Sequence, residues 1–454
     1  MKVISTNPAT GQVNKEFDTF SKEQIDGVCR ASREAFEEWR GLELSDRTEY
    51  MKKLAIALRA KREEYARSMT IEMGKPIRQS LAEIEKCAWT ADVYADNADR
   101  WLADEIVQAE AKKSFVTLQP LGVILNVMPW NFPFWQALRC AIPSLVVGNV
   151  SILRHSNSVP ISAMAIENAF VAAGFPPNVF RTVITDHDEV KRLIRSKFID
   201  GVSLTGSLEA GMDVGAVAGK NVKKVVLELG GSDPFIVLED ADIQAAAQKA
   251  AESRNVNSGQ SCIAAKRFIV VKSVADEFTR SLVACMQKQK VGDPMDMITD
   301  TGPMANKKQL ETLEDQVKRS LDVGATIACG GKRMQTNGYF YEPTVLTNVK
   351  PNMPVAKEEV FGPVAPVIVV KNEIEAIKLA NNSSFGLGAS VWTKDAGRGE
   401  RVARAIEAGM VYVNSMVVSD PRFPFGGVKA SGVGRELSRY GLLEFANIKS
   451  VVIK

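Results

Sequence analysis

The chain has 454 residues, of which 45% are hydrophobic and 24% charged, the balance of an ordinary globular protein. Its formal net charge of +3 is too small to predict a nucleic-acid surface or a polybasic membrane patch. No run approaches the roughly 18 apolar residues that a membrane span needs, and the polar N-terminus lacks the apolar core of a signal peptide. We therefore expect a cytoplasmic protein that binds neither nucleic acid nor membrane.

Cysteine and histidine usage argues against several kinds of site. The six cysteines are far apart and include no Cys-x-x-Cys pair, so we expect a reducing compartment and neither a disulfide framework nor a zinc site. Only two histidines are present, which argues against a histidine-rich metal centre or a Ser-His-Asp triad. We expect no metal.

The first hundred residues predict three helices. Ser21 and Gln24 can form a capping box, after which apolar residues recur on one face as far as Trp39. A second helix is expected from about 46 to 74, where a Gly-Lys-Pro run ends it, and a third from about 77 to 96.

From Gly122 the pattern changes to strands separated by helices. Buried strands are predicted at 122–127, 150–153, 181–184, 200–204 and 223–229. This alternation implies right-handed βαβ units in a parallel sheet, with ligands beyond the carboxyl ends of its strands.

A second α/β unit is predicted after a boundary near residue 230, where the alternation begins again with strands at 234–238 and 267–272. Two isolated strands, near 115 and near 451, would be left unpaired alone. We expect them to be edge strands or contacts between subunits.

Two residues, Cys262 and Glu228, are the strongest candidates for a role in catalysis. Cys262 ends the small, polar run Asn-Ser-Gly-Gln-Ser, which would leave its sulfur reachable, although a single cysteine in such a loop is usually just a buried thiol. Glu228 follows the apolar run 225–227, and burial would raise its pKa toward the range useful for a base.

Six motifs in the chain together resemble the aldehyde dehydrogenase superfamily, in the family's order and over essentially the whole sequence. They lie at 129–133, 205–211, 228–231, 259–262, 359–363 and 424–429. The resemblance implies a Rossmann-like cofactor domain (1–103 and 122–229), a second α/β catalytic domain (230–428) and a small β oligomerisation element (104–121 and 429–454). Homodimers or homotetramers are then expected.

The resemblance implies covalent catalysis. Cys262 is expected to attack the aldehyde, giving a thiohemiacetal and, once hydride has left, a thioester. Asn131 would hold the oxyanion with the Cys262 backbone N–H, and Glu228 would activate the hydrolytic water. The competing interpretations are an inert thiol, a turn asparagine and a structural ion-pair partner.

NAD or NADP is the implied cofactor. Gly206, Ser207 and Gly211 lie between a strand and a helix whose N-terminus is available to the diphosphate, although this glycine pair alone is a weak signal. The resemblance places Glu359 at the nicotinamide ribose, with Phe361 nearby, and adds Trp130 and Leu229 to the cofactor site.

The segment after the next strand departs from the family's usual Lys-Pro-x-Glu run. Arg154 keeps a positive donor for the adenosine ribose or a 2′-phosphate, unless it is a mere surface charge. Asn157 replaces the acid with which many NAD-specific members repel that phosphate, so NADP should be tolerated.

Substrate recognition rests on fewer residues. Arg139 occupies the place where family members that oxidise succinate semialdehyde carry an arginine able to grip a carboxylate, although it could be a snorkelling helix residue. Ser419 is expected to hydrogen-bond the distal carboxylate, and Trp135 and Phe425 to wall an aromatic passage. Val256 replaces a second arginine of several such members, and whether the nearby Arg254 reaches the substrate stays open.

We therefore expect NAD(P)-dependent oxidation of succinate semialdehyde to succinate, as in the bacterial branch of the family that these motifs resemble. One alternative is another small aliphatic or aromatic aldehyde. The other is a non-catalytic structural or binding protein on the same fold, against which Cys262, Glu228 and Asn131 argue.

Overall fold

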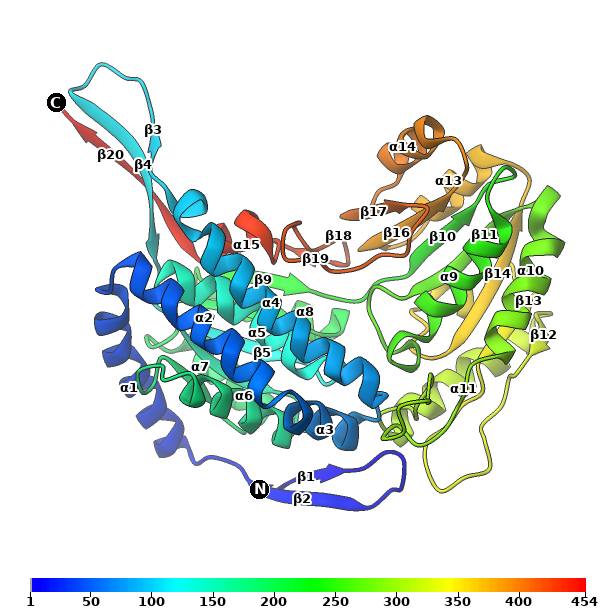
Figure 1. The fold of residues 1–454 in the computed structure, drawn as a ribbon, viewed down its shortest axis with the longest axis horizontal. Coiled ribbons are helices and arrows are strands. Elements are labelled where there is room, and N and C mark those ends of the chain that lie inside the picture. Colours follow the sequence, from blue (N-terminus) through cyan, green and yellow to red (C-terminus); the bar gives the residue numbers. More distant parts are fainter. Residues whose placement is uncertain (1) are drawn as a thin grey trace.

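The computed structural model describes residues 2–454, which form two α/β units and a projecting arm (Figure 1). The first unit is a six-stranded sheet in the order β19-β9-β8-β5-β6-β7. Strands β5 to β9 are parallel and β19 is antiparallel to β9. The bounds are β5 (Val123–Met128), β6 (Val150–His155), β7 (Phe180–Thr182), β8 (Gly201–Thr205), β9 (Lys224–Glu228) and β19 (Gly432–Val433). The order reverses between β5 and β8, the position at which such sheets bind ligands.

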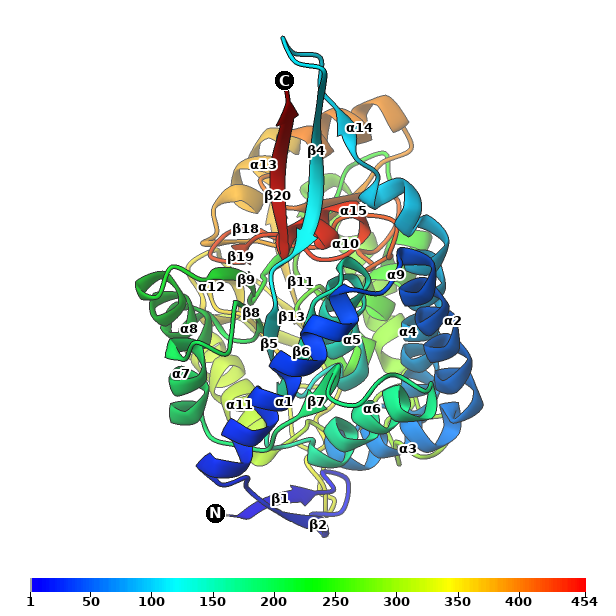
Figure 2. The ribbon, with the colours of Figure 1, turned by 90° about the vertical axis from the view of Figure 1, so that its left-hand side faces the viewer.

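Helices cover both faces of this sheet. Figure 2 shows α7 (His187–Arg195) and α8 (Leu208–Lys220) on one side, with α2 (Leu44–Ala60) and α4 (Ile77–Leu102) on the other. The others are α1 (Lys22–Arg40), α3 (Arg62–Met73), α5 (Pro133–Val147) and α6 (Pro160–Ala172). The single helix predicted at 46–74 is wrong: Lys61, at φ −113° and ψ 24°, leaves the helical region and separates α2 from α3.

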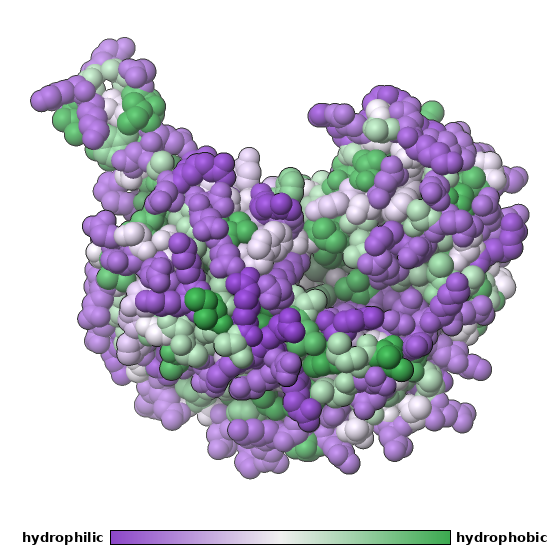
Figure 3. Space-filling view, in the orientation of Figure 1, coloured by the Kyte–Doolittle hydropathy of each residue, from purple (hydrophilic) through white to green (hydrophobic). Residues whose placement is uncertain are grey.

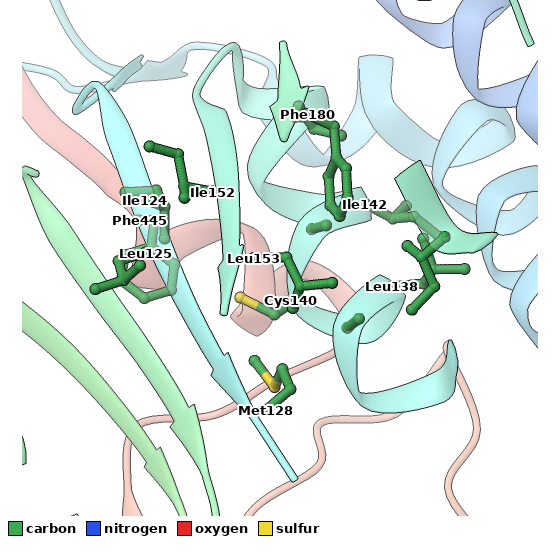
Figure 4. Close-up of a cluster of buried hydrophobic side chains, with 14 of the residues drawn as sticks. Ile124, Leu125, Met128, Leu138, Cys140, Ile142, Ile152, Leu153, Phe180 and Phe445 are labelled. Carbon is green, nitrogen blue, oxygen red and sulfur yellow. The ribbon is translucent and has the colours of Figure 1, made fainter. Parts of the chain in front are cut away.

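Helix α5 is the centre of the first core. Every residue from Pro133 to Val147 is buried, because the helix packs between the sheet and α4 rather than at the surface. Figure 4 shows Leu138 and Cys140 of α5 beside Leu153 of β6 and Met128 of β5. Side chains carried by α5 are therefore held rigidly.

The second unit is a seven-stranded sheet in the order β12-β13-β14-β11-β10-β16-β17, parallel except for β12 against β13. Its strands are β10 (Asp233–Val237), β11 (Ala265–Val271), β12 (Thr326–Cys329), β13 (Thr344–Thr347), β14 (Val364–Val370), β16 (Gly388–Trp392) and β17 (Met410–Val413). Its helices are α9 (Ile243–Asn255), η1 (Val256–Gly259), α10 (Lys272–Gln287), α11 (Lys307–Asp322), α12 (Pro354–Lys357), α13 (Glu373–Asn381) and α14 (Ala396–Ala405).

The arm is a three-stranded antiparallel sheet that extends away from both units (Figures 1 and 2). Strand β20 (Ala446–Ile453) pairs along its whole length with β4 (Lys113–Pro120), which also pairs with β3 (Glu105–Ile106). The two isolated strands expected from the sequence are thus partners within one chain.

The C-terminal segment contributes to more than the arm. β18 (Val428–Lys429) pairs with β15 (Phe385–Gly386), β19 joins the first sheet, and α15 (Ser438–Glu444) packs on α5. Of the residues predicted as an oligomerisation element, β3, β4 and β20 form the arm, whereas β18, β19 and α15 lie outside it. A separate hairpin joins β1 (Lys2–Thr6) to β2 (Val13–Asp18). Within residues 2–454, no helix has the length and apolar character to cross a membrane.

Candidate active site

A strained loop between α9 and β11 presents Cys262. Asn257, Ser258 and Gly259 have φ values of 53°, 55° and 78°, a region that costs a non-glycine residue about 1–3 kcal/mol. Ser258 Oγ donates to the Gly302 carbonyl at 3.0 Å, which helps to hold this conformation. A Cβ on Gly259 would lie 2.3 Å from the Gly362 backbone, so only glycine fits there. The loop is therefore fixed in advance of any ligand.

Cys262 lies where two cavities meet. Each has a volume of about 270 Å³, and Cys262 and Gln136 line both. One opens toward the carboxyl ends of β5 and β8, and the other lies among α4, α5 and the 416–419 segment. Figure 3 shows the surface hollowed between the two α/β units. A thiol between two cavities can meet one ligand from each side.

The Cys262 side chain is half-buried, and that burial raises the pKa of its thiol to about 11. The positive charges of Arg139 and Lys266 act in the opposite direction. Lys266 is itself buried, and its Nζ donates to the carbonyls of Ser261 at 2.9 Å and Cys262 at 2.5 Å. The resting sulfur is thus a thiol that must lose its proton before it can attack.

Asn131 is held by both ends of its amide. Its Oδ1 accepts from Gln136 Nε2 at 2.9 Å, and its Nδ2 donates to the Gln260 carbonyl at 3.1 Å. An amide nitrogen has two hydrogens, so a second donor remains for a ligand. Since Asn131 and Cys262 line the same cavity, this donor can serve the oxyanion.

Glu228, at the end of β9, is not brought to either cavity. Burial, and next the negative charge of Glu436, raise the pKa of its carboxyl well above the usual range. Neither carboxyl oxygen has a hydrogen-bond partner among residues 2–454. The carboxyl lies against Gly426, where a Cβ would be 2.5 Å from Oε1. In this position, the surroundings of Glu228 favour the protonated form of its carboxyl, which lines neither cavity.

The cavity at the sheet edge collects most of the predicted cofactor residues. Trp130, Gly206, Ser207, Leu229, Glu359 and Phe361 all line it. Ser207 caps α8 by accepting from Ala210 N at 3.2 Å, and it also lines the cavity. The N-terminus of α8 therefore lies at the cavity, where it favours an anion.

Close packing shapes the rest of this cavity. A Cβ on Gly211 would lie 2.4 Å from the Leu229 side chain, which keeps α8 tight against the end of β9. Glu359 accepts the Gly231 N–H at 3.0 Å, and the rings of Trp130 and Phe361 meet edge-on at 5.8 Å. A carboxylate, a helix N-terminus and apolar walls fit a dinucleotide.

Three predicted cofactor residues do not line this cavity: Gly211, which packs on Leu229, and Arg154 and Asn157. Arg154 is only 4% exposed, and its Nε and Nη2 both donate to the Thr185 carbonyl, at 3.2 and 3.0 Å. These two bonds use Nε and Nη2, so only the remaining N–H groups of Arg154 could serve a cofactor, and its predicted role stays a prediction. Asn157 is half-buried in the loop after β6, whose last residue, His155, pairs with Met128 at the end of the central strand β5.

The predicted substrate residues Trp135, Arg139, Ser419 and Phe425 line the second cavity together, as does Val256. Arg254 does not line it; the fully buried Arg254 Nη2 donates to the Gly259 carbonyl at 2.5 Å, behind the loop. Arg139 forms an ion pair with Glu436, donates to Thr205 Oγ1 at 3.3 Å and lies 4.2 Å over the Phe425 ring. Its charge is therefore balanced within the protein.

Comparison with known proteins decides the family. The sequence profile of the aldehyde dehydrogenase family matches residues 1–451. The chain belongs to the aldehyde dehydrogenase family. A Synechocystis sp. protein named "Probable succinate-semialdehyde dehydrogenase [NADP(+)]" is 48% identical over 453 residues, 100% of each chain. "Succinate-semialdehyde dehydrogenase [NADP(+)] 1" of Mycobacterium tuberculosis is 44% identical over 456 residues, again 100% of each.

Solved structures agree with the predicted aldehyde dehydrogenase fold. The succinic semialdehyde dehydrogenase of Streptococcus pyogenes, determined with NADP+, superposes with a TM-score of 0.97 at 36% identity and covers 99% of each chain. The α/β fold expected from the sequence is thus confirmed.

Three residues of this aldehyde dehydrogenase site had no signal in the sequence. Gln136 orients Asn131, Glu436 pairs with Arg139, and Lys86 lines the substrate cavity from α4. Each lies far in the sequence from at least one other residue of the site, and only the folded chain brings them together. Within the described residues, no cluster of three or more His, Cys, Asp or Glu side chains could hold a metal ion.

Proposed function

We propose that this aldehyde dehydrogenase oxidises succinate semialdehyde to succinate with NADP+ or NAD+. The observation that carries the proposal is the place of Cys262 between a cavity suited to a dinucleotide and one that contains cationic side chains. The names of the Synechocystis and mycobacterial relatives support the same substrate.

In the proposed reaction, the Cys262 thiol gives its proton to solvent and its sulfur bonds to the aldehyde carbon, while the C=O π bond breaks and leaves its electron pair on the oxygen. The oxyanion that forms accepts hydrogen bonds from Asn131 Nδ2 and the Cys262 backbone N–H. One such donor is worth about 3–4 kcal/mol in the transition state. A bound dinucleotide would supply the hydride acceptor, and loss of hydride from the thiohemiacetal carbon would leave a thioester on Cys262. Trp130, Ser207, Leu229 and Glu359 would hold the dinucleotide.

Glu228 is assigned to the hydrolysis of this thioester. Its carboxyl must turn from Gly426 toward Cys262 and ionise before it can take a proton from water. A buried carboxyl with no hydrogen-bond partner loses no such bond when it turns, which makes the movement inexpensive.

NADP is the cofactor for which the loop after β6 is better suited. Ser156, Asn157 and Ser158 carry no charge, so a 2′-phosphate beside them meets no carboxylate. The Streptococcus pyogenes structure, which holds NADP+, supports this choice.

We further propose that the arm joins subunits in a homodimer or homotetramer. Ile448 and Val452, on one face of it, are 59% and 58% exposed, an apolar surface that a second chain would cover. The six free cysteines fit a reducing cytoplasm.

A panel of aldehydes tests the proposed activity. We expect kcat/KM with NADP+ to be about 10- to 100-fold higher for succinate semialdehyde than for pentanal, because a charge-assisted hydrogen bond is worth about 1.5–3 kcal/mol. A higher kcat/KM for pentanal or benzaldehyde would show that succinate semialdehyde is not the preferred substrate. Absence of turnover with every aldehyde would favour a non-catalytic protein.

A further inference from the structure

The charges around the substrate cavity almost all have partners. Arg139 pairs with Glu436, buried Lys75 pairs with Glu83, and Arg422 binds Asp420 through its Nη2 at 2.6 Å. Glu83 also lines the cavity, and its Oε1 accepts the Trp135 backbone N–H at 2.9 Å. These pairs leave no net charge for a ligand to neutralise.

Lys86 is the exception. It lines the cavity from α4, and no carboxylate lies within ion-pairing distance of its ammonium in residues 2–454. Its Nζ donates to Ser419 Oγ and lies 4.1 Å over the Trp135 ring. Both partners are neutral. They fix the position of the ammonium without cancelling its charge.

The surroundings make this charge costly. Most of the cavity wall is apolar, contributed by side chains such as Phe132, Val256, Ile263 and Met416. Burial, and then the positive charge of Arg139, lower the pKa of Lys86 to about 8. An anion placed beside Lys86 would relieve both effects, so the site favours a ligand with a negative charge.

We propose that Lys86, together with the Ser419 hydroxyl, binds the carboxylate of the substrate and selects short aldehydes that carry a carboxylate at the far end. This inference rests on the proposed function and names the residue that enforces it. Arg139 also lines the cavity, but its ion pair with Glu436 already balances its charge, so it adds less to the attraction for an anion than Lys86 does. Val256, apolar and on the same cavity, cannot contribute a charge.

The arrangement also orients the substrate. Lys86 and Ser419 come from α4 and the 416–419 segment, whereas Cys262 lies at the junction with the cofactor cavity. A carboxylate bound by Lys86 directs the other end of a short chain toward the sulfur. Because this contact exists before and during the reaction, its loss should raise KM and leave kcat nearly unchanged.

The test compares two aldehydes in three proteins: wild type, Lys86→Met and Lys52→Met. Methionine retains the length and apolar stem of lysine but removes its charge, and Lys52 is an exposed residue of α2 that does not line the cavity. With saturating NADP+, Lys86→Met should show about a 10- to 100-fold higher KM for succinate semialdehyde. Its KM and kcat for pentanal should match those of the wild type, as should all constants of Lys52→Met. Inhibition by succinate should weaken by the same factor.

The outcomes separate the two proposals. Unchanged KM for succinate semialdehyde in Lys86→Met, with a wild type that prefers this substrate, would overturn the assignment of Lys86 alone. Equal losses with both aldehydes would also overturn it, because they would indicate a structural role. A wild type with no preference for succinate semialdehyde would overturn the proposed function itself.

Discussion

Arg139 and Glu436 form an ion pair inside the protein, with side chains that are only 2% and 4% exposed. Breaking a buried pair by removing one partner typically costs about 3–5 kcal/mol, because the other charge is left uncompensated. The pair also lies beside Glu228, whose pKa the Glu436 charge raises and the Arg139 charge lowers. Its first role is therefore in the structure of the site.

Arg139→Leu is expected to lower the free energy of unfolding by about 3–5 kcal/mol, measured by urea denaturation. Arg139→Leu with Glu436→Leu should recover much of this loss, because no charge is then left unpaired. If Arg139→Leu were as stable as the wild type but lost only its affinity for succinate semialdehyde, Arg139 would be the carboxylate-binding residue.

Asn157→Glu should restore discrimination against NADP. A carboxylate in the loop after β6 would repel the 2′-phosphate, so KM for NADP+ should rise about 10- to 100-fold while KM for NAD+ stays within about twofold. Asn157→Gln is the control of equal size without charge. Equal effects of both variants on both cofactors would show that the 2′-phosphate binds elsewhere.

His155 should make the protein less stable in mild acid. Its Nδ1 accepts the Ser156 N–H at 2.9 Å and its Nε2 bonds the Pro133 carbonyl at 3.0 Å, an arrangement that needs the neutral ring. Burial lowers its pKa from 6.5 to about 4. Between these values the unfolded chain binds the proton first, so the contribution is complete above pH 6.5 and is lost as the pH falls toward 4.

The measurement is urea unfolding of wild type and His155→Gln at pH 7.5 and pH 5. The wild type should lose about 2 kcal/mol more than the variant between these pH values. Glu72 and Asp233, with pKa values raised to about 7 by burial, act in the opposite direction but are present in both proteins. Equal losses of unfolding free energy in the wild type and His155→Gln would contradict the role given to His155.

The proposed role of the arm in joining subunits can be tested by introducing charge on its exposed face. Replacing both Ile448 and Val452 by lysine places two cations on its exposed apolar face, and the assembly should separate into monomers on size-exclusion chromatography. Ile374→Lys, on the exposed face of α13, is the control and should elute with the wild type. If the double variant eluted with the wild type, the arm would not be the contact.

The strands of both sheets could be predicted from the sequence, because they depend on local patterns. Buried strands such as β5 are short apolar runs, and the residues around Cys262 form a contiguous motif. Contacts between side chains that are far apart in the sequence could not be predicted in this way. The sequence around Arg139 does not indicate that it pairs with Glu436. Likewise, the sequence around Arg154 does not indicate that it donates to the Thr185 carbonyl.

The contact of Lys86 with Ser419 also could not be predicted from the sequence. On α4 it is one charged residue among many of an amphipathic helix, and only the approach of the segment carrying Ser419 gives it a role. The break at Lys61 was also hidden, because good helix-forming residues continue on both sides of it.

The central claim is that the Cys262 sulfur becomes bonded to the carbon of the aldehyde. The most direct measurement is mass spectrometry of Glu228→Gln quenched during reaction with succinate semialdehyde and NADP+, in which hydrolysis should be slow. We predict about one NADPH per subunit in a burst and a succinyl group on the peptide that contains Cys262. Steady NADPH formation with an unmodified Cys262, or full activity in Cys262→Ala, would contradict the account.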